Sequence, residues 1–123
     1  MSRWKNLSFA ARLRFALQGF AHALSSERSL RVQCLAVLAL LLVLVVLRPA
    51  PLWWALLLLA SAGVLAAELL NTAIERLADA LHPAQSPAIR AAKDSAAAGV
   101  LLAVLGALAA GAAFLTHLAG RGA

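Results

Sequence analysis

Residues 52–81 read LWWALLLLASAGVLAAELLNTAIERLADAL, and this stretch decides the fold class. From Leu52 to Ala67 it carries no charge, which predicts a helix that spans a membrane. The second half introduces four polar side chains at spacings of three, four and four residues: Glu68, Asn71, Glu75 and Asp79. These spacings place all four on one stripe of a helix, and the stripe begins before the apolar run has fully ended.

The composition of the whole chain agrees with a membrane protein. Of the 123 residues, 63% are hydrophobic and 13% are charged, which predicts one integral membrane domain over residues 1–123. The net charge is +6, but the basic residues flank apolar runs, so they indicate membrane orientation and no nucleic-acid partner. Cys34 is the single cysteine, which excludes a disulfide within the chain.

Three helices are expected to cross the membrane, over about residues 27–47, 52–72 and 95–118. The first apolar run, residues 32–47, would be about 24 Å long as a helix, which is short for a bilayer core of about 30 Å. We therefore extend this helix back through Glu27, with Ser25 or Ser26 as a candidate N-cap.

Local signals mark the ends of the other two spans. Trp53 and Trp54 begin the second span and are typical of an aromatic anchor at the membrane interface. Ser86 and Pro87 predict the N-cap and the first position of the third helix. That helix is expected to continue to about Leu118.

The first part of the chain, residues 4–24, predicts an amphipathic helix that lies on the membrane surface. Its apolar side chains recur at helical spacing and its polar side chains fall on another face, with Phe9, Leu13, Leu17, Phe20 and Leu24 against Arg14, Gln18 and His22. An exposed helix packed on its own protein is the alternative.

Lysine and arginine indicate the orientation of the chain. If the N-terminus is cytoplasmic, Arg48 and Arg121 lie outside and nine basic residues lie inside, namely Arg3, Lys5, Arg12, Arg14, Arg28, Arg31, Arg76, Arg90 and Lys93. This excess of positive charge on one side predicts a cytoplasmic N-terminus.

The third span also repeats small residues every seven positions, at Ala96, Ala103 and Ala110 and at Gly99, Gly106 and Ala113. Small residues allow helices to approach closely in lipid, so this helix is expected to pack centrally. Such a small three-helix chain is also expected to form oligomers.

All five acids lie at the cytoplasmic ends of the spans in this topology, namely Glu27, Glu68, Glu75, Asp79 and Asp94. A core of about 30 Å measured from Trp53 ends near Thr72, which puts Glu68 inside the apolar slab and Glu75 at its edge. An ionisable group inside a membrane is costly, so Glu68 is a functional candidate. The alternative, for Glu68 and for Asn71, is a hydrogen bond between helices that serves packing.

The other charged residues have simple explanations when each is taken singly. Glu27 can be a carboxylate favoured by a helix N-terminus, and Arg90 with Asp94 can be an ordinary pair four residues apart. Glu75 can lie at a solvated helix end. Taken together with Lys93, the carboxylates would also suit Mg²⁺ and phosphate. The sequence has no glycine-rich phosphate-binding loop.

Three segments resemble the small bacterial membrane lipid kinases, the diacylglycerol kinase and undecaprenol kinase family: GFAHALSSERSLRVQ (19–33), ELLNTAIERLADAL (68–81) and AAKDSAAAGVLL (91–102). The likeness covers roughly Phe15 to Val104. It implies a homotrimer of three-span subunits with an N-terminal surface helix, in the inner (cytoplasmic) membrane. It also implies an active site on the cytoplasmic side, where the γ-phosphate of MgATP is transferred to a lipid hydroxyl.

The resemblance implies roles for single residues. Glu68 matches the general base, and Glu27 and Glu75 match the carboxylates that hold Mg²⁺. The positions that match ATP-binding residues are Glu27, Glu75, Asn71, Lys93 and Asp94. Arg12, Arg14 and Phe15 are candidate contacts to ATP or lipid, and the family often has tyrosine where this chain has Phe15.

The expected reaction is phosphorylation of diacylglycerol to phosphatidic acid. Phosphorylation of undecaprenol is the alternative, because the HP at residues 82–83 and SSERSLR at residues 25–31 look closer to the undecaprenol branch. Two alternatives are not enzymes: a small proton-coupled transporter with Glu68 as proton carrier, and a purely structural oligomer.

Overall fold

The computed structural model describes residues 5–121, and these form four helices: α1 Phe9–Ser26, α2 Arg28–Leu47, α3 Pro51–Leu81 and α4 Pro87–Arg121. The helices α2, α3 and α4 are long and apolar enough to cross a membrane. The expected all-α architecture, a short N-terminal helix followed by three apolar helices, is confirmed. The described residues contain no strand.

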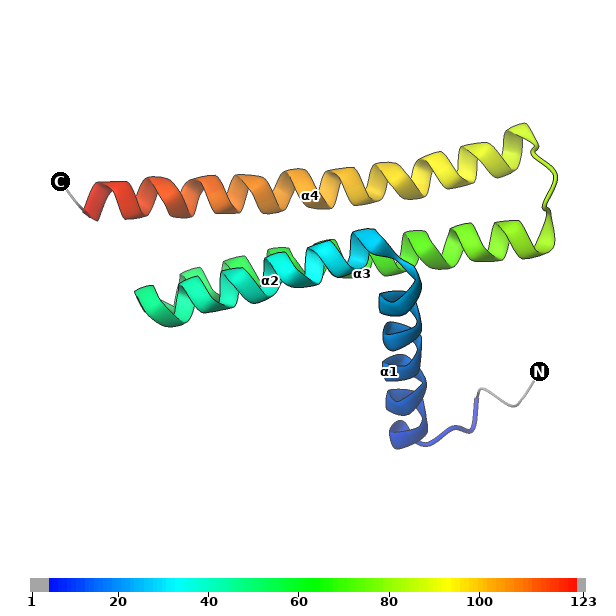
Figure 1. Ribbon diagram of the computed structural model, residues 1–123, viewed down its shortest axis with the longest axis horizontal. Helices are drawn as coiled ribbons and strands as arrows, with labels where there is room; N and C mark the ends of the chain where they lie inside the picture. The colour runs from blue at the N-terminus through cyan, green and yellow to red at the C-terminus, as the bar shows by residue number, and fades with distance from the viewer. Residues whose placement is uncertain (1–4, 122–123) are drawn as a thin grey trace.

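A sharp corner separates α1 from α2, and the two helices run in clearly different directions in Figure 1. Glu27 makes the corner with extended backbone, at φ −108° and ψ 112°. The expectation that Ser25 or Ser26 would N-cap the second helix is wrong. Their hydroxyls donate to the carbonyl oxygen of His22 at 2.7 and 3.0 Å, so both serines end α1, and Glu27 occupies the N-cap position of α2.

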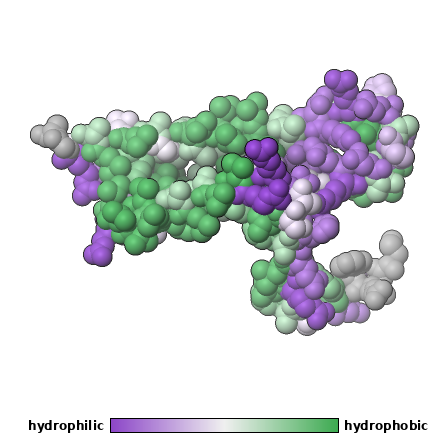
Figure 2. Space-filling view, viewed as in Figure 1, coloured by the Kyte–Doolittle hydropathy of each residue, from purple (hydrophilic) through white to green (hydrophobic). Residues whose placement is uncertain are grey.

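α1 begins at Phe9, where the Ser8 hydroxyl accepts a hydrogen bond from the Ala11 amide at 3.2 Å. Residue 4, the expected start of this helix, lies outside the described residues. In Figure 2 the apolar side of α1 lies towards the apolar part of the long helices. Its hydrophilic side lies towards the hydrophilic ends of those helices. Phe9 is 81% exposed, so α1 is not packed on its own protein at that end. This arrangement agrees with a helix lying in the membrane interface.

The turn between α2 and α3 precedes a small buried core. Arg48 ends α2 with left-handed backbone, at φ 49°, and Pro51 is the first residue of α3. Nearby, the buried side chains of Leu44, Leu57 and Phe114 join the three long helices. Trp53 packs on this core, with its ring 5.2 Å from that of Phe114, and is only partly exposed.

The expected N-cap of the third span is confirmed, because Ser86 Oγ accepts a hydrogen bond from the Ile89 amide at 3.2 Å. α3 and α4 contain 31 and 35 residues. They are therefore about 46 and 52 Å long, against a bilayer core of about 30 Å. Both helices project past the level of α1, and Figure 2 shows that these projecting ends are hydrophilic.

α3 is the central helix of the described chain. Its backbone approaches α1, α2 and α4, whereas the backbones of α2 and α4 do not approach each other. The expectation that the third span would pack centrally is therefore wrong for a single chain. Two positions of its small-residue face, Gly99 and Gly106, have no neighbouring atom within 4 Å of where a Cβ would stand.

Candidate functional site

Glu68 is a buried acid in the apolar part of α3, with 7% of its surface exposed. It lies 17 residues into the helix, about 26 Å from the start of α3, so a bilayer core of about 30 Å that begins at the start of α3 would include it. Ser29 Oγ donates to its Oε1 at 2.5 Å, and Gln33 Nε2 donates to its Oε2 at 3.3 Å. Both oxygens are therefore held by α2, as expected of an ionisable group that faces protein and not lipid.

Ser29 and Gln33 were not among the residues expected at the site. They are four residues apart in α2, so they share one face of that helix. The signal in the sequence was the single polar residue, Gln33, in the apolar run of residues 32–47.

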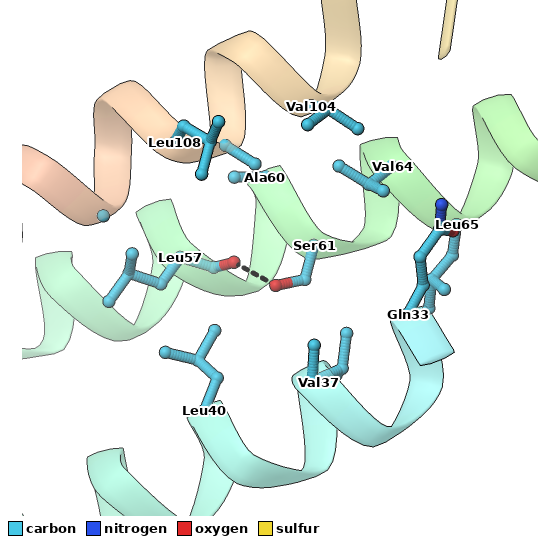
Figure 3. Close-up of a pocket in the computed structure, with 13 residues that line it drawn as sticks. Gln33, Val37, Leu40, Leu57, Ala60, Ser61, Val64, Leu65, Val104 and Leu108 are labelled. Atoms are coloured by element: carbon cyan, nitrogen blue, oxygen red, sulfur yellow. Dashed lines mark hydrogen bonds between the residues drawn. The ribbon is translucent and has the colours of Figure 1, made fainter. Parts of the chain in front are cut away.

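A cavity of about 310 Å³ lies between α2, α3 and α4 (Figure 3). Its lining residues are apolar except Gln33 and Ser61. Gln33 lies at one end, and Leu57, which belongs to the buried core, lies towards the other. An apolar space in the membrane part of the chain thus reaches the side chain that holds Glu68.

Asn71 and Glu75 form a second polar pair, one and two turns further along α3. Asn71 Nδ2 donates to Glu75 Oε1 at 3.3 Å. The amide oxygen of Asn71 is buried and has no hydrogen-bond partner among the described residues. Glu68 and Asn71 were expected on one stripe of a helix, and their partners differ: Glu68 bonds to residues of α2, whereas Asn71 bonds to Glu75 of its own helix.

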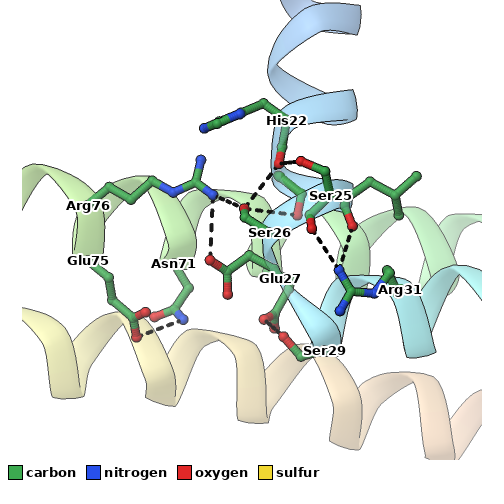
Figure 4. A network of polar contacts seen from close by, with 12 residues as sticks. His22, Ser25, Ser26, Glu27, Ser29, Arg31, Asn71, Glu75 and Arg76 are labelled. Atoms are coloured by element: carbon green, nitrogen blue, oxygen red, sulfur yellow. Dashed lines mark hydrogen bonds and ion pairs between the residues drawn. The ribbon is translucent and has the colours of Figure 1, made fainter.

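Glu27 lies at the corner between α1 and α2, where it pairs with Arg76 of α3 at 3.5 Å (Figure 4). Arg76 also donates to the hydroxyl of Ser26. From the other side, Arg31 Nη1 donates to the carbonyl oxygens of Leu24 and Ser25 at 3.1 and 3.0 Å. Two arginines therefore brace the corner that carries Glu27.

Lys93 connects the projecting ends of α3 and α4 through a 2.6 Å contact between its Nζ and Asp79 Oδ1. Asp94 pairs with Arg90 at 3.9 Å, and both side chains are largely exposed, so this pair adds little stability. Such an ordinary pair, four residues apart, was the simple explanation that the sequence offered for Arg90 and Asp94.

Arg12, Arg14 and Phe15 lie in the first half of α1. Among the described residues neither arginine forms an ion pair with an acid, and the Arg14 guanidinium lies 5.4 Å from the centre of the Phe15 ring. The structure of one chain therefore does not bring them to the acids of α3.

Oxygen donors for Mg²⁺ are present but dispersed in one chain. Glu75 and Asn71 lie side by side, and the unpartnered amide oxygen of Asn71 has the donor chemistry that Mg²⁺ prefers. Glu27, in contrast, faces Arg76. The described residues include no group of three or more acids, histidines or cysteines arranged to hold a metal. The residues thus fit Mg²⁺ in kind, but the described residues do not form a complete metal site.

The fold and the buried acid define an all-helical multi-pass membrane protein whose polar and charged side chains gather at one end of its spans. Residues 14–115 match the family model of prokaryotic diacylglycerol kinase. The chain belongs to this family, which includes undecaprenol kinases, and is therefore an ATP-dependent lipid kinase. Comparison with curated proteins gives no match. Family membership removes the two alternatives that were not enzymes.

Proposed function

We propose that this kinase phosphorylates diacylglycerol to phosphatidic acid and that Glu68 is the general base. The observation that carries the proposal is the place of Glu68, buried in the apolar part of α3 and held through both oxygens by Ser29 and Gln33. The hydroxyl of a membrane lipid stays near the bilayer, so its base has to lie at that depth. A carboxylate with two donors is also fixed in orientation, as proton transfer requires.

In this mechanism the lipid hydroxyl gives its proton to Glu68 while its oxygen bonds to the γ-phosphorus of ATP. The bond from that phosphorus to the bridging oxygen of ADP breaks, and the products are the lipid phosphate and ADP. Such a transfer depends mainly on positioning and on neutralisation of charge. Ser29 and Gln33 supply the positioning of the base.

We place the nucleotide at the hydrophilic ends of α3 and α4. Glu27 and Glu75 would hold Mg²⁺, which neutralises phosphate charge when bound, and the ATP-binding set comprises Glu27, Glu75, Asn71, Lys93 and Asp94. Lys93 and Asp94 line a polar cavity of about 290 Å³ at the start of α4. Arg12, Arg14 and Phe15 remain candidate contacts to ATP or lipid.

The assembly and orientation belong to the same proposal. A homotrimer would cover the open small-residue face of α4 and could complete the dispersed metal site from a second chain. The excess of basic residues at the N-terminal side favours a cytoplasmic N-terminus and active site. Arg3, which contributes to that excess, lies outside the described residues.

Replacement of Glu68 by glutamine tests the base. Glu68→Gln keeps the size of the side chain but cannot take a proton, so lipid phosphorylation should fall by about two to four powers of ten. Nucleotide binding and oligomer size should not change. Near-normal turnover in Glu68→Gln would remove Glu68 as the base, and loss of the oligomer would favour a packing role.

Undecaprenol is the second candidate substrate, since SSERSLR and the HP of residues 82–83 look closer to that branch. The two lipids should be offered in competition in the same micelles, with each labelled product measured separately. Diacylglycerol is expected to be phosphorylated faster. A preference for undecaprenol would reverse the substrate assignment without changing the role of Glu68.

A further inference from the structure

Gln33 has one polar atom that holds Glu68 and another without a partner. Its Nε2 donates to Glu68 Oε2 at 3.3 Å. Because a carboxylate accepts hydrogen bonds and cannot donate them, this contact fixes which end of the amide faces Glu68. The amide oxygen is then left free, and it is buried without a hydrogen-bond partner among the described residues.

The same side chain lines the apolar cavity shown in Figure 3. The other polar side chain in the wall, Ser61, donates to the carbonyl oxygen of Leu57 at 2.8 Å. A buried water needs two to four polar partners, and this space offers few. With about 310 Å³, the cavity has the size of a small ligand pocket, which is roughly 300–1,000 Å³. It suits a hydrocarbon chain that ends in a hydrogen-bond donor.

We propose that Gln33 determines lipid specificity, because its free amide oxygen accepts a hydrogen bond from a second donor on the lipid headgroup while the chain of that lipid lies in the cavity. This inference rests on the role of Glu68 proposed above. A lipid kinase must hold a lipid chain beside its base, and this cavity reaches the base through Gln33.

The chemistry of the headgroup follows from counting donors. A reacting hydroxyl that donates to Glu68 has no hydrogen left for Gln33. A lipid alcohol with a second hydroxyl beside the first, such as a monoacylglycerol, can donate to both residues. Diacylglycerol has an ester oxygen at that place, which only accepts hydrogen bonds. Gln33 should therefore raise kcat/KM for the two-donor lipid relative to that for diacylglycerol, which remains a substrate because its single hydroxyl can still donate to Glu68.

The test compares 1-oleoylglycerol with dioleoylglycerol in mixed micelles at saturating ATP. Gln33→Met keeps the length of the side chain and removes its amide, so the ratio of kcat/KM for the two lipids should fall roughly three- to tenfold, the worth of one hydrogen bond. Gln18→Met, the same change on an exposed position of α1, should leave the ratio as in the unmodified kinase.

An unchanged ratio in Gln33→Met, or an equal loss with both lipids, would overturn the specificity role. Either result would leave the assignment of Glu68 standing, because that assignment is tested by turnover of Glu68→Gln. If Gln33→Met does not fold, Gln33→Asn carries the test. It keeps the amide on a shorter arm and should also lower the ratio.

The position of the lipid's hydrocarbon chain in the cavity is tested separately. Ala107 lines the cavity and is partly buried, whereas Ala109 is exposed on the same helix. Ala107→Leu should shift the preference severalfold from eighteen-carbon towards eight-carbon monoacylglycerols, because it fills space that a long chain needs. Ala109→Leu is the matched control. Identical chain-length profiles for the two variants would exclude this cavity as the chain site.

Discussion

Glu68 shows how a single acid can be kept in an apolar segment. Each of its two carboxylate oxygens receives a hydrogen bond from α2, and only 7% of the residue is exposed. Hydrogen bonds to charged groups contribute about 1.5–3 kcal/mol, and an unmatched buried charge would cost more. The two donors therefore make the buried carboxylate tolerable and fix the direction in which it can accept a proton.

Removal of the shorter of these hydrogen bonds tests that argument. Ser29→Ala leaves Glu68 Oε1 without its donor, so the carboxylate can turn away from the lipid hydroxyl. Lipid phosphorylation should fall roughly ten- to a hundredfold, which corresponds to the worth of a hydrogen bond to a charged group. Ser95→Ala is the control, because the Ser95 hydroxyl donates at 2.8 Å to a carbonyl of its own helix. Equal rates for the two variants would show that Ser29 does not position the base.

The sequence identified Glu68 but not its partners, for a physical reason. A charge within an apolar run is visible from hydropathy alone. Which residues of α2 face it depends on how α2 and α3 are rotated about their axes, and no local pattern records that rotation. Ser29 therefore resembled an ordinary polar residue at the start of a helix.

The corner between α1 and α2 is the element whose geometry the sequence did not predict. Serines are favoured at helix N-caps, but their hydroxyls also bond back to carbonyls of the preceding turn. Ser25 and Ser26 do the latter, and Glu27 takes the extended conformation. The start of α4 was predictable because Ser86 is followed by Pro87, and proline is tolerated at the first position of a helix.

The arginine that joins this corner to α3 gives a prediction for the element. Arg76→Gln removes the 3.5 Å pair with Glu27, whose side chains are 39% and 33% exposed. The pair is partly screened, so the cost in global stability should be small, about 0–1 kcal/mol. Amide exchange at residues 24–28 should nevertheless become faster, because α1 loses one of its two braces. Arg90→Gln breaks the exposed pair on α4 and should leave exchange at the corner as it was. Unchanged amide exchange in Arg76→Gln would show that Arg31 alone stabilises the corner.

At the scale of the whole molecule, a single chain buries few of its side chains. α4 approaches the rest of the described backbone through α3, and it has the lowest buried share of the three candidate spans. Apolar side chains of a membrane helix can face lipid without cost, but a row of small residues is typical of a helix interface. The number of long apolar helices followed from hydropathy. Contacts between chains could not be predicted in the same way, since any such contact would depend on surfaces that a single chain leaves open.

The open face of α4 and the dispersed oxygen donors lead to a prediction about shared sites. If active sites form between subunits of a homotrimer, Glu68 of one chain and Lys93 of another serve the same site. Glu68→Gln and Lys93→Ala subunits, each inactive alone, should then regain part of the activity when they are unfolded, mixed and reassembled. In a trimer with independent mixing, some sites combine an intact Glu68 with an intact Lys93.

Oligomers made from one variant alone are the control. The composition of the mixed oligomers should be verified by mass spectrometry of differently tagged chains. Mixed trimers that remain inactive would show that each site is built within one chain, and the single chain would then have to bring Lys93 from Asp79 to the nucleotide by itself.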